Sequence, residues 1–144
     1  MADTNQLRVR LVTPERILVD APADAVELPS KSGYMEVLYG AAPLMAELGA
    51  GDVIVHAAAD AGGAAGAQHY NVSWGFAEVL PDRVTILASD ALKPEEIDVP
   101  RAHSQLDRGQ KMWSEAGESE EAYAEALHVI AEAEAKLATA AEKR

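Results

Sequence analysis

The feature that most constrains the fold is a change in hydrophobic period near residue 88. Before this point, short segments rich in valine, leucine and isoleucine are separated by Pro, Gly, Asp and Ser, which is typical of an all-β domain. After it, alanine and glutamate dominate and apolar residues recur at helical spacing. The sequence therefore predicts a β domain over residues 1–88, a connector over 89–97 and a helical domain over 98–144.

In the β domain, Leu7, Val9 and Leu11 alternate with Arg8 and Arg10, so the two sets of side chains should meet core and water. Further short strands are predicted at residues 17–19, 25–28, 34–38, 45–48, 53–58, 70–72, 76–80 and 84–88. Either a sandwich or a barrel accommodates this many short strands, and a β-sandwich of two packed antiparallel sheets is predicted.

Two turns are predicted between these strands. Pro81-Asp82 lies between two apolar runs, and the fixed φ of proline with the local hydrogen bonding of aspartate favours a tight hairpin turn. The glycine- and alanine-rich residues 60–67 are expected to form the tip of another hairpin.

The helical domain is predicted to be an antiparallel two-helix hairpin. Asp98 and Ser119 are candidate N-caps of its two helices, and residues 115–119 form the break between them. The expected apolar stripes are Ala102, Leu106, Gly109 and Trp113 on the first helix, and Tyr123, Leu127, Ile130, Leu137 and Ala141 on the second. Abundant alanine buries little area per residue, so the hairpin should dock weakly and be able to move.

Charge and composition exclude several classes of function. The formal net charge of −12 opposes binding to nucleic acid or anionic lipid, and no apolar run is long enough to cross a bilayer. With no cysteine, there is no disulfide framework and no thiolate nucleophile.

No catalytic or metal site is expected from motif spacing. The histidines, His56, His69, His103 and His128, do not occur at metal-ligand spacing, so packing or surface roles are predicted. Ser73 lacks the surrounding nucleophile-turn motif, and the glycines at 62, 63 and 66 lack the lysine that follows in a phosphate loop. A non-catalytic protein that works by contacting partners is predicted, rather than a stand-alone sandwich enzyme.

Several stretches carry a family resemblance: VTPERIL at 12–18, SWGFAEV at 73–79, PDRVTILA at 81–88 and IDVPRA at 97–102. In order and spacing they resemble the epsilon subunit of the rotary ATP synthase, called delta in mitochondria. The resemblance implies a ten-stranded β-sandwich that binds the gamma shaft and the ring of c subunits. It also implies a helical hairpin that restrains ATP hydrolysis at the alpha/beta catalytic head.

The resemblance places a partner contact in the segment from Gly33 to Leu44, where the family usually reads G-x-x-G-x-x-P-G-H-x-P-L. Glu36, Tyr39 and Ala41 replace the usual glycine, proline and histidine. The residues expected to contact the c-ring or gamma are Gly33, Tyr34, Met35, Leu38 and Tyr39, together with Trp74, which replaces a family glycine. The alternative is a loop that faces the core.

A nucleotide site is the second functional alternative, because I-D-x-x-R-A resembles the motif of those epsilon subunits that bind ATP. Ile97, Asp98, Arg101 and Ala102 fit this motif, and Arg108 matches a further basic position. Forked arginine donors suit a triphosphate, but the second helix offers Glu132 and Lys136 where ATP-binding members present arginines. No cofactor is required, and weak ATP binding stays an alternative to a simple capped helix start.

The charge of the second helix bears on regulation, since its glutamates outnumber its basic residues. In relatives a basic hairpin meets an acidic segment of the beta subunits, and like charges reduce affinity across an interface. Weaker inhibition than in basic-tailed relatives is therefore predicted. The absence of a transit peptide suggests a bacterial origin, with the protein peripheral on the cytoplasmic face of the plasma membrane.

Overall fold

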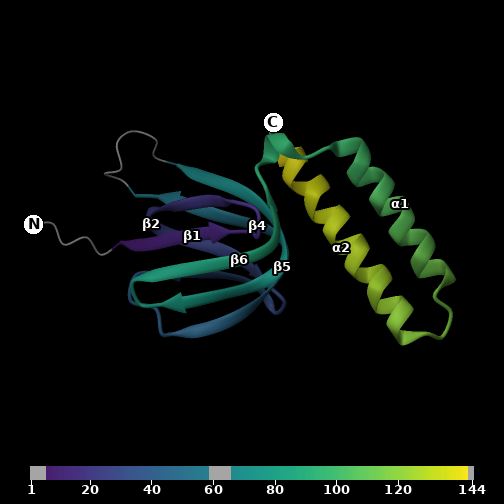
Figure 1. The fold of residues 1–144 in the computed structure, drawn as a ribbon, viewed down its shortest axis with the longest axis horizontal. Coiled ribbons are helices and arrows are strands. Elements are labelled where there is room, and N and C mark those ends of the chain that lie inside the picture. Colours follow the sequence, from purple (N-terminus) through teal and green to yellow (C-terminus); the bar gives the residue numbers. More distant parts are fainter. Residues whose placement is uncertain (1–5, 59–65, 143–144) are drawn as a thin grey trace, which may run out of the picture. The chain divides into compact units, whose positions relative to one another are not determined.

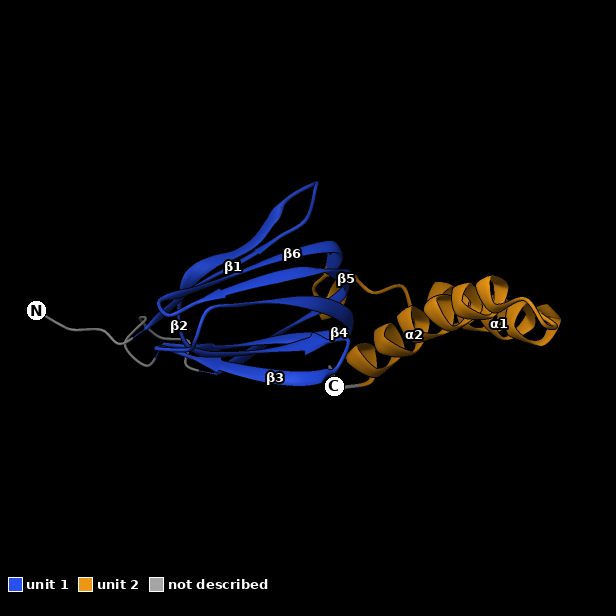
Figure 2. Ribbon diagram, turned by 90° about the horizontal axis from the view of Figure 1, so that it is seen from below, with its two compact units in different colours: residues 1–91 blue, residues 92–144 orange. Residues whose placement is uncertain are grey.

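The computed structural model describes residues 6–58 and 66–142. The chain divides into two compact units, Met1–Ala91 and Leu92–Arg144. The first is built of strands and the second of helices (Figures 1 and 2).

The β unit contains six strands within its described residues: β1 Leu7–Val12, β2 Ile17–Ser30, β3 Gly33–Leu38, β4 Leu44–Ala57, β5 Ala67–Leu80 and β6 Arg83–Leu92. Their order is β1-β6-β5-β4-β2-β3, and an additional β1–β2 pairing closes the sheet on itself. The β1–β6 pair is parallel, which departs from the all-antiparallel expectation. The result is a barrel-like β-sandwich, so the predicted fold class is confirmed.

Three pairs of predicted short strands are joined into single long strands. β2, β4 and β5 each have 14 residues, so the described part of the unit has six continuous strands instead of the ten implied by the resemblance. In β4 both Leu48 and Val53 belong to the core, although side chains an odd number of positions apart face opposite sides of a regular strand. β4 therefore changes its buried face midway and contributes to both layers of the sandwich.

β5 changes face beside β4, at Trp74 and Gly75. Their φ angles are 59° and 126°, and the register with β4 runs unbroken past them. A Cβ at Gly75 would overlap the carbonyl oxygen of Leu87, so no other residue fits there without movement. A positive φ costs a residue other than glycine about 1–2 kcal/mol, so Trp74 is held in a strained conformation.

Several local predictions in the β unit are confirmed. Leu7, Val9 and Leu11 are fully buried while Arg8 and Arg10 are exposed, and a turn at residues 81–82 joins β5 to β6. The last strand was predicted too short, because β6 continues to Leu92 and buries Ala91 in the core. Residues 60–65 of the predicted hairpin tip lie outside the described residues.

The helical unit contains a short 3₁₀ helix, Pro94–Glu96, followed by α1 Val99–Glu115 and α2 Glu120–Glu142. Both predicted caps are confirmed. The Asp98 carboxylate accepts the Arg101 amide at 3.1 Å, and the Ser119 hydroxyl oxygen accepts the Ala122 amide at 3.1 Å. The two helices lie side by side as the predicted antiparallel hairpin (Figure 1). No helix in the described ranges has the length and apolar character needed to span a membrane.

The predicted apolar stripes were only partly right. The buried positions are Ala102 and Gly109 on α1, and Ala126, Ala133 and Thr139 on α2. Trp113, Tyr123 and Leu127 are exposed, with the Trp113 and Tyr123 rings 5.9 Å apart. A Cβ added at Gly109 would lie 2.8 Å from Ile130 Cγ1, so the small residue permits a close approach of the helices there. Val129 and Ile130 pack at this contact, whereas Trp113, Tyr123 and Leu127 lie outside it.

Candidate interaction surface

An open side of the sandwich is bordered by two strand edges. β3 pairs only with β2, and residues 44–46 of β4 pair only with β5, among the residues that the structure describes. Between these edges lies a hollow of about 450 Å³ lined by residues 30–35 and 44–47. We call these two lining segments the seam. Unpaired strand edges expose backbone donors and acceptors that a partner can satisfy.

Trp74 lies beside the seam through its contact with Lys31. The Lys31 amide donates to the Glu47 carbonyl at 2.9 Å, and its ammonium lies 3.1 Å from the Glu47 carboxylate. The same ammonium is 5.8 Å from the centroid of the Trp74 ring, within range of a cation–π contact. Trp74 adopts a positive φ, which agrees with the glycine that the resemblance places at this position.

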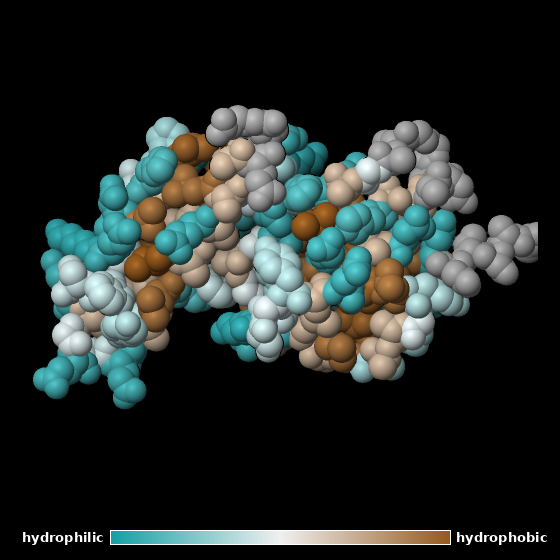
Figure 3. Space-filling model, turned by 180° about the vertical axis from the view of Figure 1, so that it is seen from behind, coloured by the Kyte–Doolittle hydropathy of each residue, from teal (hydrophilic) through white to brown (hydrophobic). Residues whose placement is uncertain are grey.

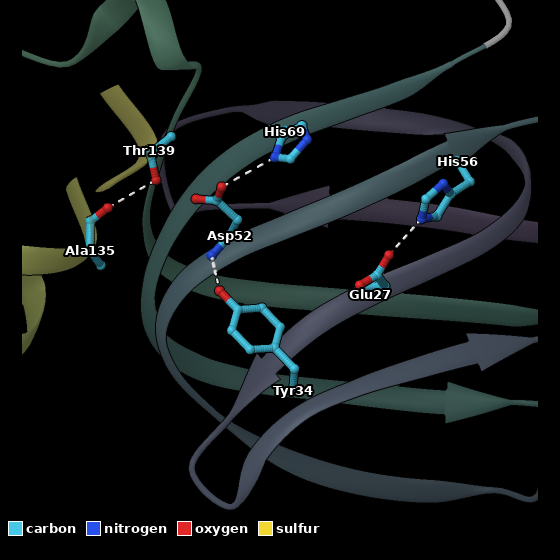
Figure 4. Close-up of polar contacts among 7 residues, drawn as sticks. All are labelled: Glu27, Tyr34, Asp52, His56, His69, Ala135 and Thr139. Atoms are coloured by element: carbon cyan, nitrogen blue, oxygen red, sulfur yellow. Dashed lines mark hydrogen bonds and ion pairs between the residues drawn. The ribbon is translucent and has the colours of Figure 1, made fainter. Parts of the chain in front are cut away.

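Tyr34 is held across β4 with much of its ring in solvent. Its side chain is 60% exposed, and its hydroxyl oxygen accepts the Asp52 amide at 2.9 Å (Figure 4). A Cβ at Gly51 would lie 2.5 Å from the same hydroxyl, so the tyrosine can cross there because position 51 is glycine. The core-facing alternative is wrong for Tyr34 and partly right for Met35, which packs against the core.

The other predicted contact residues lie along β3 and the turn after it. Gly33 begins β3 with a φ of 124°, while Leu38 and Tyr39 are exposed at its far end. The structure therefore brings Gly33, Tyr34 and Met35 together in the seam and leaves Leu38 and Tyr39 outside its lining.

Leu44, Met45 and Phe76 were not predicted as contact residues, yet all three are exposed. Phe76 precedes the buried Ala77 by one position, so it points to the outer face of β5. An apolar residue on the outward-facing positions of a half-buried strand was the signal that could have identified this surface. Figure 3 shows that apolar side chains reach the molecular surface in patches on both units.

The predicted nucleotide residues are arranged around the start of α1. The Asp98 carboxylate caps the helix, Ala102 is buried, and Ile97 precedes the cap. Arg101 and Arg108 are exposed and lie seven residues apart, about 10 Å along one face of the helix. The capped helix start is therefore present, and nucleotide binding stays a prediction.

On α2, the two residues expected from the resemblance to replace the family's arginines interact with each other. The Lys136 ammonium lies 3.6 Å from the Glu132 carboxylate, which also accepts Gln105 Nε2 at 3.4 Å. This ion pair leaves less positive charge for a phosphate than arginines would.

The remaining polar candidates differ in their surroundings. Ser73 is 1% exposed, and its hydroxyl is buried without a hydrogen-bond partner among the described residues. His69 contacts Asp52 at 3.2 Å, and His128 lies 4.0 Å from Glu132. His56 contacts Glu27 at 2.7 Å, and Glu36 lies close to both, a grouping that spacing along the sequence does not reveal.

Comparison with known proteins identifies the family. Residues 6–94 match the family described as "ATP synthase, Delta/Epsilon chain, beta-sandwich domain". An ATP synthase epsilon chain from Solibacter usitatus is 40% identical over 143 residues, covering 99% of this chain and 100% of the relative. This chain belongs to the ATP synthase delta/epsilon family. An epsilon chain from Koribacter versatilis is 39% identical over 117 residues, which cover 81% of this chain and 77% of the relative.

Solved structures agree with this family in fold. A chain of the Euglena gracilis mitochondrial ATP synthase, in an assembly of OSCP, F1 and c-ring, matches with a TM-score of 0.77 and 21% identity. The match covers 99% of this chain and 84% of that one. A chain of the Tetrahymena thermophila central stalk and c-ring matches with a TM-score of 0.51 and 14% identity over 63% of this chain and 69% of that one. The delta/epsilon architecture of a β-sandwich and two helices therefore spans this whole chain.

Proposed function

We propose that this family member is a non-catalytic rotor subunit of a proton-translocating ATP synthase, joining the gamma shaft to the c-ring. The observation that carries the proposal is the seam, where two strand edges border a hollow beside exposed Tyr34 and Met45. Large exposed apolar side chains and unpaired strand edges are features of protein interfaces. The contact residues would be Gly33, Tyr34 and Met35 in the seam, with Leu38, Tyr39 and Trp74 at the margins of the interface.

The helical unit would act as a conformational brake on ATP hydrolysis through the alpha/beta head. Glu120, Glu121 and Glu125 crowd the first turns of α2, which reduces its attraction to an acidic partner segment. The brake would be weaker than in relatives with a basic hairpin. Removal of the residues after Leu92, where β6 ends, from a reconstituted synthase is expected to raise hydrolysis only slightly, and a large increase would contradict this part of the proposal.

The complex would hold the protein at the membrane peripherally, on the cytoplasmic face of a bacterial plasma membrane. Alkaline or chaotropic washing should release the chain together with other soluble subunits. Retention of the isolated chain in lipid after such washing would argue for direct insertion instead.

The contact with gamma and the c-ring can be tested with a charge placed in the seam. Met45 is 66% exposed, so Met45→Glu should leave the fold intact while burying a charge in the interface on assembly. A loss of about 2–5 kcal/mol in affinity for the gamma and c-ring subcomplex is expected, measured by co-purification and by a binding titration.

Ile17→Glu provides the matched control, because Ile17 is 56% exposed on β2 outside the seam. It should assemble as the unaltered chain does. Equal losses for the two variants would place the contact elsewhere on the sandwich. Recovery of the chain from cells with no gamma or c-ring attached would refute the rotor function itself.

The alternative of an ATP-sensing module draws support from Arg101 and Arg108, which are exposed on one face of α1. Calorimetric titration of the full chain with ATP separates it from the rotor function alone. Absence of heat at millimolar ATP would remove this alternative.

A further inference from the structure

Three side chains with metal-ligating atoms converge on the outer face of the β unit. They are Glu27 on β2, Glu36 on β3 and His56 on β4. One ligand atom from each lies within 4.8 Å of the other two, and His56 Nε2 is 2.7 Å from Glu27 Oε2 (Figure 4). These residues do not line the seam.

A register shift in β2 creates this grouping. Ala23 and Val26 both face the core although they are three positions apart, and the pairing with β4 shifts between Ala23 and Ala25. After the shift, Ala25 lies directly opposite His56, and Glu27 shares the outward face with both. Without the shift, Glu27 would point into the core.

The two glutamates face each other across neighbouring strands. Glu27 and Glu36 are direct partners in the antiparallel β2–β3 pair, where like charges destabilise the pairing. Among the described residues, no lysine or arginine forms an ion pair with either glutamate. A cation held between the two carboxylates would remove the repulsion.

We propose that Glu27, Glu36 and His56 form a binding site for a zinc ion. One imidazole nitrogen and two carboxylate oxygens are a donor set that zinc accepts, and a fourth position stays open to water. Zinc ligands in a tetrahedral site lie about 3.3 Å apart, given bonds of about 2.0–2.2 Å. The half-exposed side chains can reach this geometry by small rotations, while the paired strands fix their backbones.

The donor set also predicts selectivity. Calcium requires six to eight oxygen ligands, and magnesium retains most of its waters, so neither gains much from a histidine. Zinc should therefore bind in the presence of excess magnesium. Binding should weaken in acid, because the metal competes with protons for the imidazole and the carboxylates.

Calorimetric titration of the full chain with zinc chloride tests the site. We expect one zinc ion per chain, and at least a tenfold weaker affinity in Glu36→Gln and in His56→Gln. Glu36→Gln is the sharper variant, because it removes one ligand and leaves the contact between His56 and Glu27 in place.

His69→Gln is the matched control. His69 also contacts a carboxylate, that of Asp52 at 3.2 Å, but it belongs to no group of three ligands in the described part of the chain. It should leave zinc affinity unchanged. An equal loss in His69→Gln, or no loss in Glu36→Gln and His56→Gln, would overturn the site and leave the Glu27–His56 contact as an ordinary surface ion pair.

Cobalt(II) gives a measurement that does not depend on any variant. A visible absorption band of tetrahedral cobalt, displaced by one equivalent of zinc, is expected with the unaltered chain. An octahedral spectrum equal to that of cobalt in buffer would contradict the proposal. Both outcomes are independent of assembly with gamma or the c-ring.

Discussion

The two units of this protein bury side chains of different size. The β unit buries branched side chains, including Leu48 and Val53, with no exposed surface. The helical unit buries Ala126, Ala133 and Gly109 and leaves Leu127 largely exposed. Burial of a Val or Leu side chain contributes about 1.5–3 kcal/mol, whereas alanine contributes far less. The comparison indicates a rigid β unit suited to constant contact and a helical unit that can rearrange at low cost.

The largest expected effect is in the core of the β unit. Leu48→Ala should lower the free energy of unfolding by about 3–4 kcal/mol, because a cavity forms where β4 changes face. Hydrogen exchange of the amides of β4 and β5 measures it. Leu127→Ala in the helical unit, at a side chain 45% exposed, should cost less than about 1 kcal/mol. Similar losses of stability in the two variants would contradict the difference in packing between the units.

An intermediate effect is expected at Gly109, where the two helices approach each other closely. Gly109→Leu should destabilise the helical hairpin by about 1–3 kcal/mol. The Cβ of any residue placed there would lie only 2.8 Å from Ile130 Cγ1 and 3.1 Å from Val129 Cγ1. Amide exchange in α1 and α2 should accelerate while exchange in the β unit stays unchanged. Asp107→Leu, at an exposed position on the same helix, is the control and should be nearly neutral. An unchanged hairpin in Gly109→Leu would mean that the helices separate without cost.

The smallest expected effect concerns the helix caps. Asp98→Ala should cost about 1 kcal/mol, since it removes the acceptor of the Arg101 amide. Ser119→Ala removes the equivalent acceptor at the start of α2 and should cost a similar amount. Exchange of the first-turn amides of each helix measures both. If Asp98→Ala lost much more stability than Ser119→Ala, and did so only when ATP was present, the result would support a nucleotide site at α1.

Local features of the fold followed from the sequence. The turn at Pro81-Asp82, the caps at Asp98 and Ser119, and the burial of Leu7, Val9 and Leu11 depend on neighbours close along the chain. The continuity of the long strands did not follow. Short apolar segments on either side of Gly49 and Gly51 look like two strands, because the apolar period breaks where β4 changes face.

The helical stripes were only partly right for a related reason. Periodicity identifies a face that repeats along a helix, but it favours large residues such as Tyr123 and Leu127 over alanine. The position of α1 against α2 decides which residues are buried, and Gly109 permits a contact that leaves those large residues exposed.

The candidate surfaces show the same division. The segment around Tyr34 was identified in the sequence by its family resemblance. The exposure of Met45 and Phe76 depends on which face of each strand points outward, and the tertiary structure was needed to show it.

The sequence by itself determined the change from strands to helices, the turn and caps, and the family, because each depends on residue order. The tertiary structure decided which distant residues meet: the two edges of the seam, and Glu27 with Glu36 and His56. The physical reason is that one register shift moves every following side chain of a strand to the other face. Such a shift is set by pairing between strands, and residue order alone does not specify it.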